Sequence, residues 1–243
     1  MPGPLNRPLP ILLLTRPEAA SARFAEQCGD FGLRFDTVIS PLFRIEATGS
    51  LPDASAAGGL IFTSANGVAV WLAQGGRRDL PVYTVGDTTA RASEAAGMRA
   101  HSAGGAADDL INWLIAHSPA VPLLHLHGRH TRGDVAARLT MAGLTCESDV
   151  IYDQPAQPLS AEARAALMGP APVIVPVFSP RTAELLAQER AQAPLLVAAM
   201  SEAVVNALGS LHKQDLKVAA RPESVAMREV VLDLLKRAEA GDF

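Results

Sequence analysis

Short runs of apolar residues alternate with longer, alanine-rich stretches along almost the whole chain. Such apolar runs predict strands that are buried on both faces, and the stretches between them have the spacing of amphipathic helices. The runs that predict strands are Ile11–Leu14, Phe35–Ile39, Leu60–Phe62, Val82–Val85, Leu123–Leu126, Cys146–Ile151, Val173–Phe178, Leu195–Ala199 and Leu216–Ala219. The stretches that predict helices include Glu18–Cys28, Asn66–Gln74, Asp108–His117, Val135–Met141, Ala183–Arg190 and Arg228–Ala238. The alternation predicts an α/β fold with parallel sheets covered by helices.

Four landmarks recur in the same order about 115 residues apart, which indicates an internal repeat. Each landmark lies at or just after a predicted strand, and the spacings within the two copies differ by only one or two residues. The first copy has Arg16, Pro41, Ser64 and Gly86, and the second has Arg129, Pro155, Ser179 and Met200. This repeat favours two similar lobes over a single large sheet. Polar or small-residue stretches at 48–58 and 153–160 are candidate boundaries.

The composition narrows the classes of function. A chain of 243 residues can form one large domain or two smaller ones, and its apolar fraction of 49% excludes disorder throughout. The net charge of −4 argues against a surface for nucleic acid or anionic membrane. No apolar run approaches the roughly 18 residues of a membrane span, and the first ten residues do not resemble a secretory signal. Two cysteines, Cys28 and Cys146, suit a reducing cytosol, so we expect a soluble cytoplasmic protein.

Several common motifs are missing from the sequence. It has no G-x-G-x-x-G after a strand, no G-x-x-x-x-G-K-[ST], no G-x-S-x-G and no H-E-x-x-H. Their absence argues against ordinary dinucleotide-binding, ATPase, esterase and zinc-protease functions. His125, His127 and His130 invite interpretation as metal ligands, because alternate residues of a strand share a face. With no acidic or cysteine partner close by in the sequence, a polar strand end is the better interpretation, and we expect no metal.

Hydroxyl residues stand where predicted strands pass into helices. Ser64 and Ser179 each occupy a helix N-cap position, Thr88 and Thr89 follow Gly86, and Ser201 precedes Glu202. Capping alone explains any one of them. In a parallel sheet, however, all such junctions lie at the carboxyl ends of the strands, where ligands bind. Several helix N-termini with free N–H groups would form a receptor for a polyanion.

Three arginines and one tyrosine stand at the same strand ends. Arg16, Arg129 and Arg132 would suit carboxylate or phosphate, although surface arginines are usually only solvated. Tyr152 ends the strand before the proline-containing boundary, where it could donate a hydrogen bond or act as a general acid. The alternative is a tyrosine that is half-buried for packing.

Taken together, these junctions resemble those of the uroporphyrinogen-III synthase family. The similarity covers nearly the whole chain, from the first predicted strand to Ala220-Arg221-Pro222 and the closing helix, and its specificity comes from the order and spacing of the motifs. The motifs are Leu14-Thr15-Arg16-Pro17, Ile61-Phe62-Thr63-Ser64-Ala65-Asn66-Gly67-Val68, Val85-Gly86-Asp87-Thr88-Thr89-Ala90, Gly128-Arg129-x-x-Arg132, Val150-Ile151-Tyr152 and Phe178-Ser179-Pro180.

The resemblance implies two similar α/β lobes joined by two strand-like connectors, one lobe formed by about 1–40 plus 157–243 and the other by about 44–152. It implies cyclisation of the linear tetrapyrrole hydroxymethylbilane to uroporphyrinogen III, with inversion of ring D and loss of water, without metal or organic cofactor. The enzyme that produces hydroxymethylbilane is an expected partner. Tyr152 matches the family's candidate catalytic tyrosine. The expected substrate-binding residues are Arg16, Ser64, Asn66, Thr88, Thr89, Arg129, Arg132, Ser179 and Ser201.

The second copy departs from the family pattern, because Met200-Ser201-Glu202 stands where the first copy has Gly86-Asp87-Thr88-Thr89. Glu202 would repel carboxylates if it faced the ligand. We expect Arg16, Ser64, Thr89 and Tyr152 to border one cleft between the lobes. Two other functions are open: a two-lobed solute- or effector-binding module without catalysis, and a nucleotide-sugar transferase, for which the chain is short.

Overall fold

The computed structural model describes residues 8–130 and 133–242 and divides into two compact α/β units. The first unit takes the described residues up to Arg44 and from Ala156 onward, and the second is Ile45–Pro155. The strands are β1 (Ile11–Leu14), β2 (Asp36–Ile39), β3 (Glu46–Ala47), β4 (Gly59–Phe62), β5 (Val82–Thr84), β6 (Ala100–Ser102), β7 (Leu123–Gly128), β8 (Cys146–Asp153), β9 (Val173–Val177), β10 (Leu195–Ala199) and β11 (Asp215–Val218). The helices are α1 (Glu18–Gly29), α2 (Ala65–Ala73), α3 (Asp87–Ala95), α4 (Ala107–His117), α5 (Val135–Met141), α6 (Ala161–Met168), α7 (Pro180–Leu186), α8 (Glu202–Ala207) and α9 (Ser224–Ala240).

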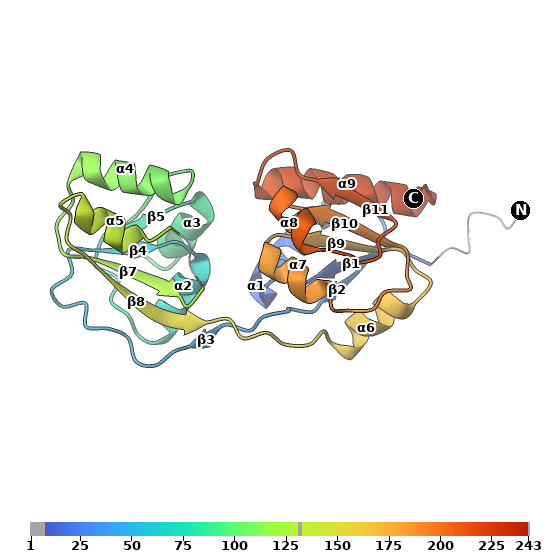
Figure 1. Ribbon diagram of the computed structural model, residues 1–243, viewed down its shortest axis with the longest axis horizontal. Coiled ribbons are helices and arrows are strands. Elements are labelled where there is room, and N and C mark those ends of the chain that lie inside the picture. The colour runs from blue at the N-terminus through green and yellow to red at the C-terminus, as the bar shows by residue number, and fades with distance from the viewer. Residues whose placement is uncertain (1–7, 131–132, 243) are drawn as a thin grey trace, which may run out of the picture. The chain divides into compact units, whose positions relative to one another are not determined.

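The first unit is a parallel sheet of order β11-β10-β9-β1-β2 with helices on both faces (Figure 1). Alternate residues of one strand enter different cores: Val173 and Val175 pack with α6, α7 and α8, whereas Ile174 packs with α1 and α9. Because both faces are covered, the central strands are apolar throughout. The predicted α/β layer structure is confirmed for this unit.

The second unit is a sheet of order β3-β8-β7-β4-β5-β6, parallel except for the short edge strand β3. Its strands again serve two cores, with Phe62 and Leu126 packing toward Trp71 of α2, and Ile61 toward Leu110 of α4. Figure 1 shows α2 on one side of this sheet and α4 and α5 on the other. Two similar lobes, each built on a predominantly parallel sheet flanked by helices, are therefore confirmed.

The two sheets have equivalent strand orders, and each sheet combines strands from both copies of the repeat. The order β2-β1-β9-β10-β11 in one unit corresponds to β8-β7-β4-β5-β6 in the other. The first copy of the repeat thus supplies β1 and β2 to the sheet of the first unit and β4 and β5 to that of the second. The second copy supplies β7 and β8 to the sheet of the second unit and β9 and β10 to that of the first. The chain must therefore pass between the units twice.

The two connecting segments are strand-like and pair with each other antiparallel. Phe43 bridges Ala156, and the backbone N–H of Gln157 donates to the carbonyl of Leu42 at 3.0 Å. Further along, Glu46 and Ala47 of β3 pair with Asp153 and Tyr152 of β8. This pairing satisfies backbone groups that would otherwise lack partners.

Some element boundaries differ from the sequence-based predictions. β7 and β8 run two residues further than their apolar cores, to Gly128 and Asp153, because pairing with a neighbouring strand extends them through polar residues. The helix predicted over Ala183–Arg190 occupies Pro180–Leu186 instead, because Ser179 caps it and proline suits its first position. The strands β3 and β6 were not predicted, since neither contains an apolar run.

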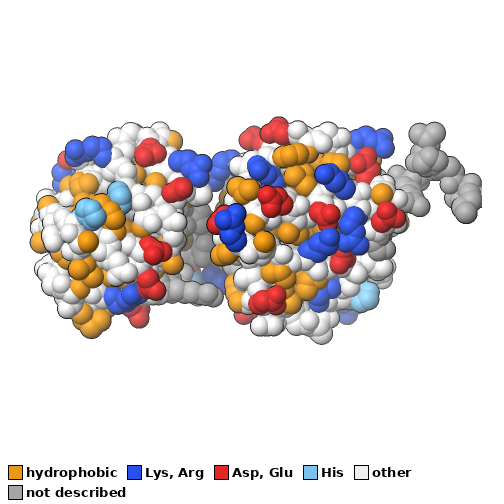
Figure 2. All heavy atoms as spheres, turned by 90° about the horizontal axis from the view of Figure 1, so that it is seen from above, with side chains coloured by type: hydrophobic (Ala, Val, Ile, Leu, Met, Phe, Trp, Pro, Cys, Tyr) orange, Lys and Arg blue, Asp and Glu red, His pale blue; other side chains and the backbone are white. Residues whose placement is uncertain are grey.

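The surface carries both signs of charge close together. Ion pairs join Lys217 to Asp233 and Arg237 to Asp215, and both connect β11 to α9. Figure 2 views the molecule from above Figure 1 and shows basic and acidic side chains interspersed on that face of the first unit. Among the described residues, no helix is long and apolar enough to cross a membrane.

We predict that His125 makes the protein acid-sensitive. The side chain is 2% exposed on β7, and its Nε2 has no hydrogen-bond partner in the part of the chain that the structure describes. Burial, with the nearby His127, lowers the pKa of His125 to about 3. A histidine in the unfolded chain titrates near 6.5. The contribution of His125 to the free energy of unfolding is therefore complete above that pH and is lost as the pH falls toward 3. At pH 5 the free energy of unfolding is lower by about 2 kcal/mol. Urea unfolding at pH 7 and pH 5 should show this loss in the wild type and not in His125→Leu. The exposed His212→Gln variant, as control, should behave like the wild type.

Candidate functional site

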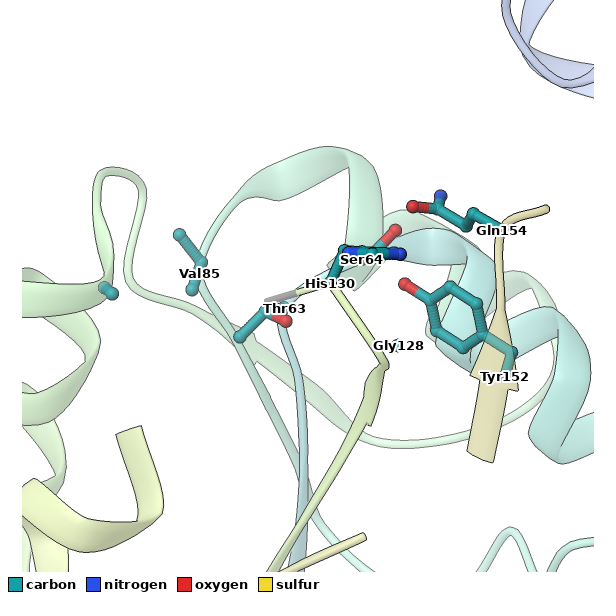
Figure 3. Close-up of a pocket in the computed structure, with 8 residues that line it drawn as sticks. Thr63, Ser64, Val85, Gly128, His130, Tyr152 and Gln154 are labelled. Carbon is teal, nitrogen blue, oxygen red and sulfur yellow. The ribbon is translucent and has the colours of Figure 1, made fainter. Parts of the chain in front are cut away.

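A pocket of about 330 Å³ opens in the second unit at the carboxyl ends of its central strands. Parallel strands place successive strand-to-helix junctions at this edge, so residues far apart in the sequence meet there. Figure 3 shows the Tyr152 hydroxyl directed toward the region of Ser64 and His130. The residues that line the pocket are Thr63, Ser64, Val85, Ala107, Gly128, His130, Tyr152 and Gln154.

The position of Tyr152 depends on a β-bulge between β7 and β8. His127 pairs with Val150 but Gly128 pairs with Tyr152, so Ile151 is an extra residue in β8. A regular strand would send Ile151 and Tyr152 to opposite faces, yet both are buried in the same core. The bulge thus turns the tyrosine ring over the end of β7 while its hydroxyl reaches the pocket.

Gly128 makes room for that ring. A Cβ at this position would lie 2.6 Å from two carbons of the Tyr152 ring and 3.0 Å from its hydroxyl oxygen. Real Cβ contacts are never this short, so any other residue would displace the ring. The glycine that ends β7 therefore sets where the phenol lies.

Tyr152 holds its proton firmly. The side chain is 5% exposed, and burial raises the pKa of its phenol, an effect that a hydrogen bond with the Ser64 side chain partly offsets. At neutral pH the group is a neutral hydroxyl that can donate to a ligand oxygen.

Ser64 caps α2 at the edge of the same pocket. Its side-chain oxygen accepts a hydrogen bond from the backbone N–H of Asn66 at 3.2 Å. The N-terminal end of a helix carries partial positive charge, so an anionic group near Ser64 would be favoured. The backbone of Asn66 thus takes part in the cap of α2, and this role does not depend on the Asn66 side chain.

The rim of the pocket carries an ion pair. Nε of Arg129 lies 2.9 Å from Asp153, and Nε2 of His130 lies 3.8 Å from the other carboxylate oxygen. A hydrogen bond from the backbone N–H of Gln154, followed by the one from Arg129, lowers the pKa of Asp153. Arg129 is therefore already paired with an acidic residue. Arg132, also predicted here, lies outside the described residues.

Thr88 and Thr89 begin α3 but differ in exposure. Thr88 is exposed, whereas Thr89 is only 6% exposed, and its backbone carbonyl accepts a hydrogen bond from Ser93 at 3.1 Å. Neither lines the pocket that holds Tyr152. Thr89 is therefore largely covered by its own unit in the described structure.

The remaining predicted residues belong to the first unit. Arg16 follows β1, and Ser179 follows β9, the strand that pairs with β1. The Ser179 side chain caps α7 by accepting from the N–H of Thr182 at 3.2 Å. Ser201 precedes α8 and makes no capping hydrogen bond with its side chain.

The histidines of β7 do not form a metal cluster with other described residues. The rings of His125 and His127 are 4.7 Å apart, and His130 lies in the pocket lining. No group of three or more described His, Cys, Asp or Glu side chains is arranged to hold a metal ion.

Of the eight residues that line the pocket, sequence reasoning identified only Ser64 and Tyr152 as site residues, and Gly128, His130 and Gln154 are among those it missed. Gly128 was noticed only as part of a motif, His130 only as a possible ligand, and Gln154 only within a boundary segment. A glycine at the end of an apolar strand signals a close approach by another group, and this signal was available for Gly128. The other two depend on the β7–β8 pairing, which the sequence does not reveal.

Comparisons with known proteins point to one family. The family model described as "Uroporphyrinogen-III synthase HemD" matches residues 22–229. A crystal structure of uroporphyrinogen-III synthetase from Helicobacter pylori matches with a TM-score of 0.67 and 15% identity, covering 93% of this chain and 100% of that one. A mutant uroporphyrinogen III synthase from Thermus thermophilus matches with a TM-score of 0.48 and 13% identity, covering 96% and 100%. No curated protein sequence matches the chain.

We predict that Gly128→Ala lowers the free energy of unfolding by about 1–3 kcal/mol, because the new methyl group overpacks against the Tyr152 ring. The displaced ring should also become more exposed, so the high phenol pKa should fall toward 10 in an ultraviolet titration. Gly29→Ala is the control, since nothing lies within 4 Å of its Cβ position. An unchanged titration in Gly128→Ala would contradict the proposed role of the glycine.

Proposed function

Because the chain belongs to the uroporphyrinogen-III synthase family, we propose that it closes hydroxymethylbilane to uroporphyrinogen III, with inversion of ring D and loss of water. Enzymes of this family are cyclising lyases of tetrapyrrole synthesis. The observation that carries the proposal is the family match over residues 22–229, most of both units. The pocket around Tyr152 supports it, because a protonated phenol lies beside a helix N-terminus there.

The substrate carries many acetate and propionate carboxylates, which need hydrogen-bond donors. Near Ser64, the N-terminal end of α2 offers a favourable dipole, while the N–H groups of Asn66 and Gly67 already donate to Ser64. The neighbouring Thr63 and Gln154 add polar side chains to the pocket lining. This supports an anionic ligand even though the chain as a whole is acidic, since the attraction is local.

Tyr152 is the proposed proton donor. As the carbon–oxygen bond of the hydroxymethyl group breaks, its electron pair goes to oxygen, and the phenolic proton completes a water molecule. A pyrrole nitrogen supplies electrons to the carbon left behind, and the proton released on ring closure restores the phenol. The raised pKa keeps the proton on Tyr152 until the leaving oxygen develops negative charge.

The other expected substrate contacts remain part of the proposal. They are Arg16, Ser64, Asn66, Thr88, Thr89, Arg129, Arg132, Ser179 and Ser201. Arg129 would have to share its guanidinium between Asp153 and a substrate carboxylate, whereas Arg16 has no acidic partner among the described residues and the Ser179 side chain caps α7. The proposed lobes remain about 1–40 plus 157–243 and about 44–152.

We further propose that the upstream enzyme hands hydroxymethylbilane to this protein, because the free substrate cyclises spontaneously to the type I isomer. A cytoplasmic location is supported by the two cysteines, which are both buried and unpaired. A co-sedimentation experiment with the purified upstream enzyme would test the transfer complex.

The decisive experiment uses freshly generated hydroxymethylbilane, with separation of the isomers after oxidation. We expect the type III isomer to dominate with the protein present, and type I in its absence. A product mixture unchanged by the protein, together with binding of the substrate, would instead favour a two-lobed binding module. A bound nucleotide in the purified protein would favour a transferase.

Among variants, Tyr152→Phe should reduce the rate of type III formation most, by about 10²–10⁴-fold, because it removes the acid. Ser64→Ala removes one neutral hydrogen bond to the substrate and should lower the rate roughly three- to tenfold. Thr89→Ala should cost no more than this. Circular dichroism should show all three folded. Near-normal activity of Tyr152→Phe with loss of activity in Ser64→Ala would make Tyr152 a packing residue.

A further inference from the structure

The backbone of Arg16 is held firmly at the carboxyl end of β1. The hydroxyl of Ser21 donates to the Arg16 carbonyl at 2.8 Å, and the N–H groups of Ala20 and Ser21 both donate to the carbonyl of Pro17. These hydrogen bonds fix the turn from β1 into α1 and, with it, the position of the backbone from which the Arg16 side chain extends.

The guanidinium of Arg16 lies over an aromatic ring. Its central carbon is 4.2 Å from the centroid of the Phe178 ring. Phe178 follows β9, which pairs with β1, so both residues stand at the same edge of the sheet. The Phe178 ring is held in turn by Phe24, which is buried on α1: the two rings meet edge to face, 5.3 Å apart at 88°.

This cation has no counter-ion among the residues that the structure describes. Within 8–130 and 133–242, the Arg16 guanidinium makes no ion pair or side-chain hydrogen bond, in contrast to Arg129, which pairs with Asp153. Burial, and then the like charge of Arg23, lower the pKa of Arg16, although an arginine stays protonated at neutral pH. A partly desolvated charge without a partner is costly, and a bound anion would relieve that cost.

The contact between Arg16 and Phe178 also determines which type of anion can bind to the guanidinium. The Phe178 ring covers one side of the guanidinium. The N–H donors of any guanidinium lie in its own plane, so they stay available beside the ring. Two parallel N–H groups in one plane match the two oxygens of a carboxylate.

We propose that Arg16 forms a carboxylate-binding site in the first unit, and that Phe178 is the positioning residue that holds the guanidinium in place for it. The inference rests on the proposed function, since it assigns one substrate carboxylate to Arg16. It adds Phe178, which has no polar atom in its side chain and makes no hydrogen bond to the ligand itself.

The test is a KM-against-kcat comparison with hydroxymethylbilane as substrate. Phe178→Leu keeps an apolar side chain against Phe24 but removes the aromatic face, so we expect KM to rise about tenfold with little change in kcat. Phe178→Tyr keeps the face and should restore KM to within about threefold of the wild type. Arg16→Lys keeps the charge but loses the planar pair of donors, and should raise KM by about tenfold.

A matched control comes from the same unit. Arg228 lies over the ring of Phe31 at 5.6 Å, and Phe31 is 50% exposed. Phe31→Leu removes an arginine–aromatic contact away from the carboxyl ends of the strands and should leave KM unchanged.

A double-mutant cycle separates positioning from packing. If Phe178 acts through Arg16, Phe178→Leu should raise KM no further in an Arg16→Ala background. Equal effects of Phe178→Leu in both backgrounds, or a lowered melting temperature with an unchanged KM, would overturn the inference while the wild type still formed the type III isomer. A wild type that formed no type III isomer would overturn the proposed function, and this inference with it.

Discussion

Each parallel sheet in this protein must be buried on both faces, and this constraint governs where polar chemistry can occur. Strands such as β9 and β10 are apolar along their whole length because helices cover both sides. The candidate site residues, which are hydroxyls, arginines and the Tyr152 phenol, therefore stand at the strand ends, where the chain turns into helices. Both candidate sites, around Tyr152 in one unit and around Arg16 in the other, lie at such ends.

Within the second unit, two backbone features turn a strand end into a site. The bulge opposite Gly128 directs Ile151 and Tyr152 into the same core, and the missing side chain of Gly128 lets the ring lie on the neighbouring strand. Burial by that packing is also what raises the phenol pKa. The position of the phenol and its acidity thus have one cause.

The two arginines that the repeat places in equivalent positions have different surroundings. Arg129 is exposed and paired with Asp153, which lies on the neighbouring strand β8. Arg16 stacks on Phe178 and has no acidic partner among the described residues. A sequence repeat preserves the place of a residue in the fold, but the side chains around it decide whether its charge is already neutralised.

From the sequence alone, the alternation of apolar runs and helical stretches determined the α/β class, and the spacing from Arg16 to Gly86 and from Arg129 to Met200 determined that there are two similar lobes. The cap positions of Ser64 and Ser179 were also determined, because capping is a local interaction. The exchange of strand pairs, the bulge before Tyr152, the burial of Thr89 and the contact between Arg16 and Phe178 were decided only by tertiary structure. Periodicity and capping report on neighbours along the chain, whereas these four features depend on which distant strand lies alongside, and that is settled by packing of the whole sheet.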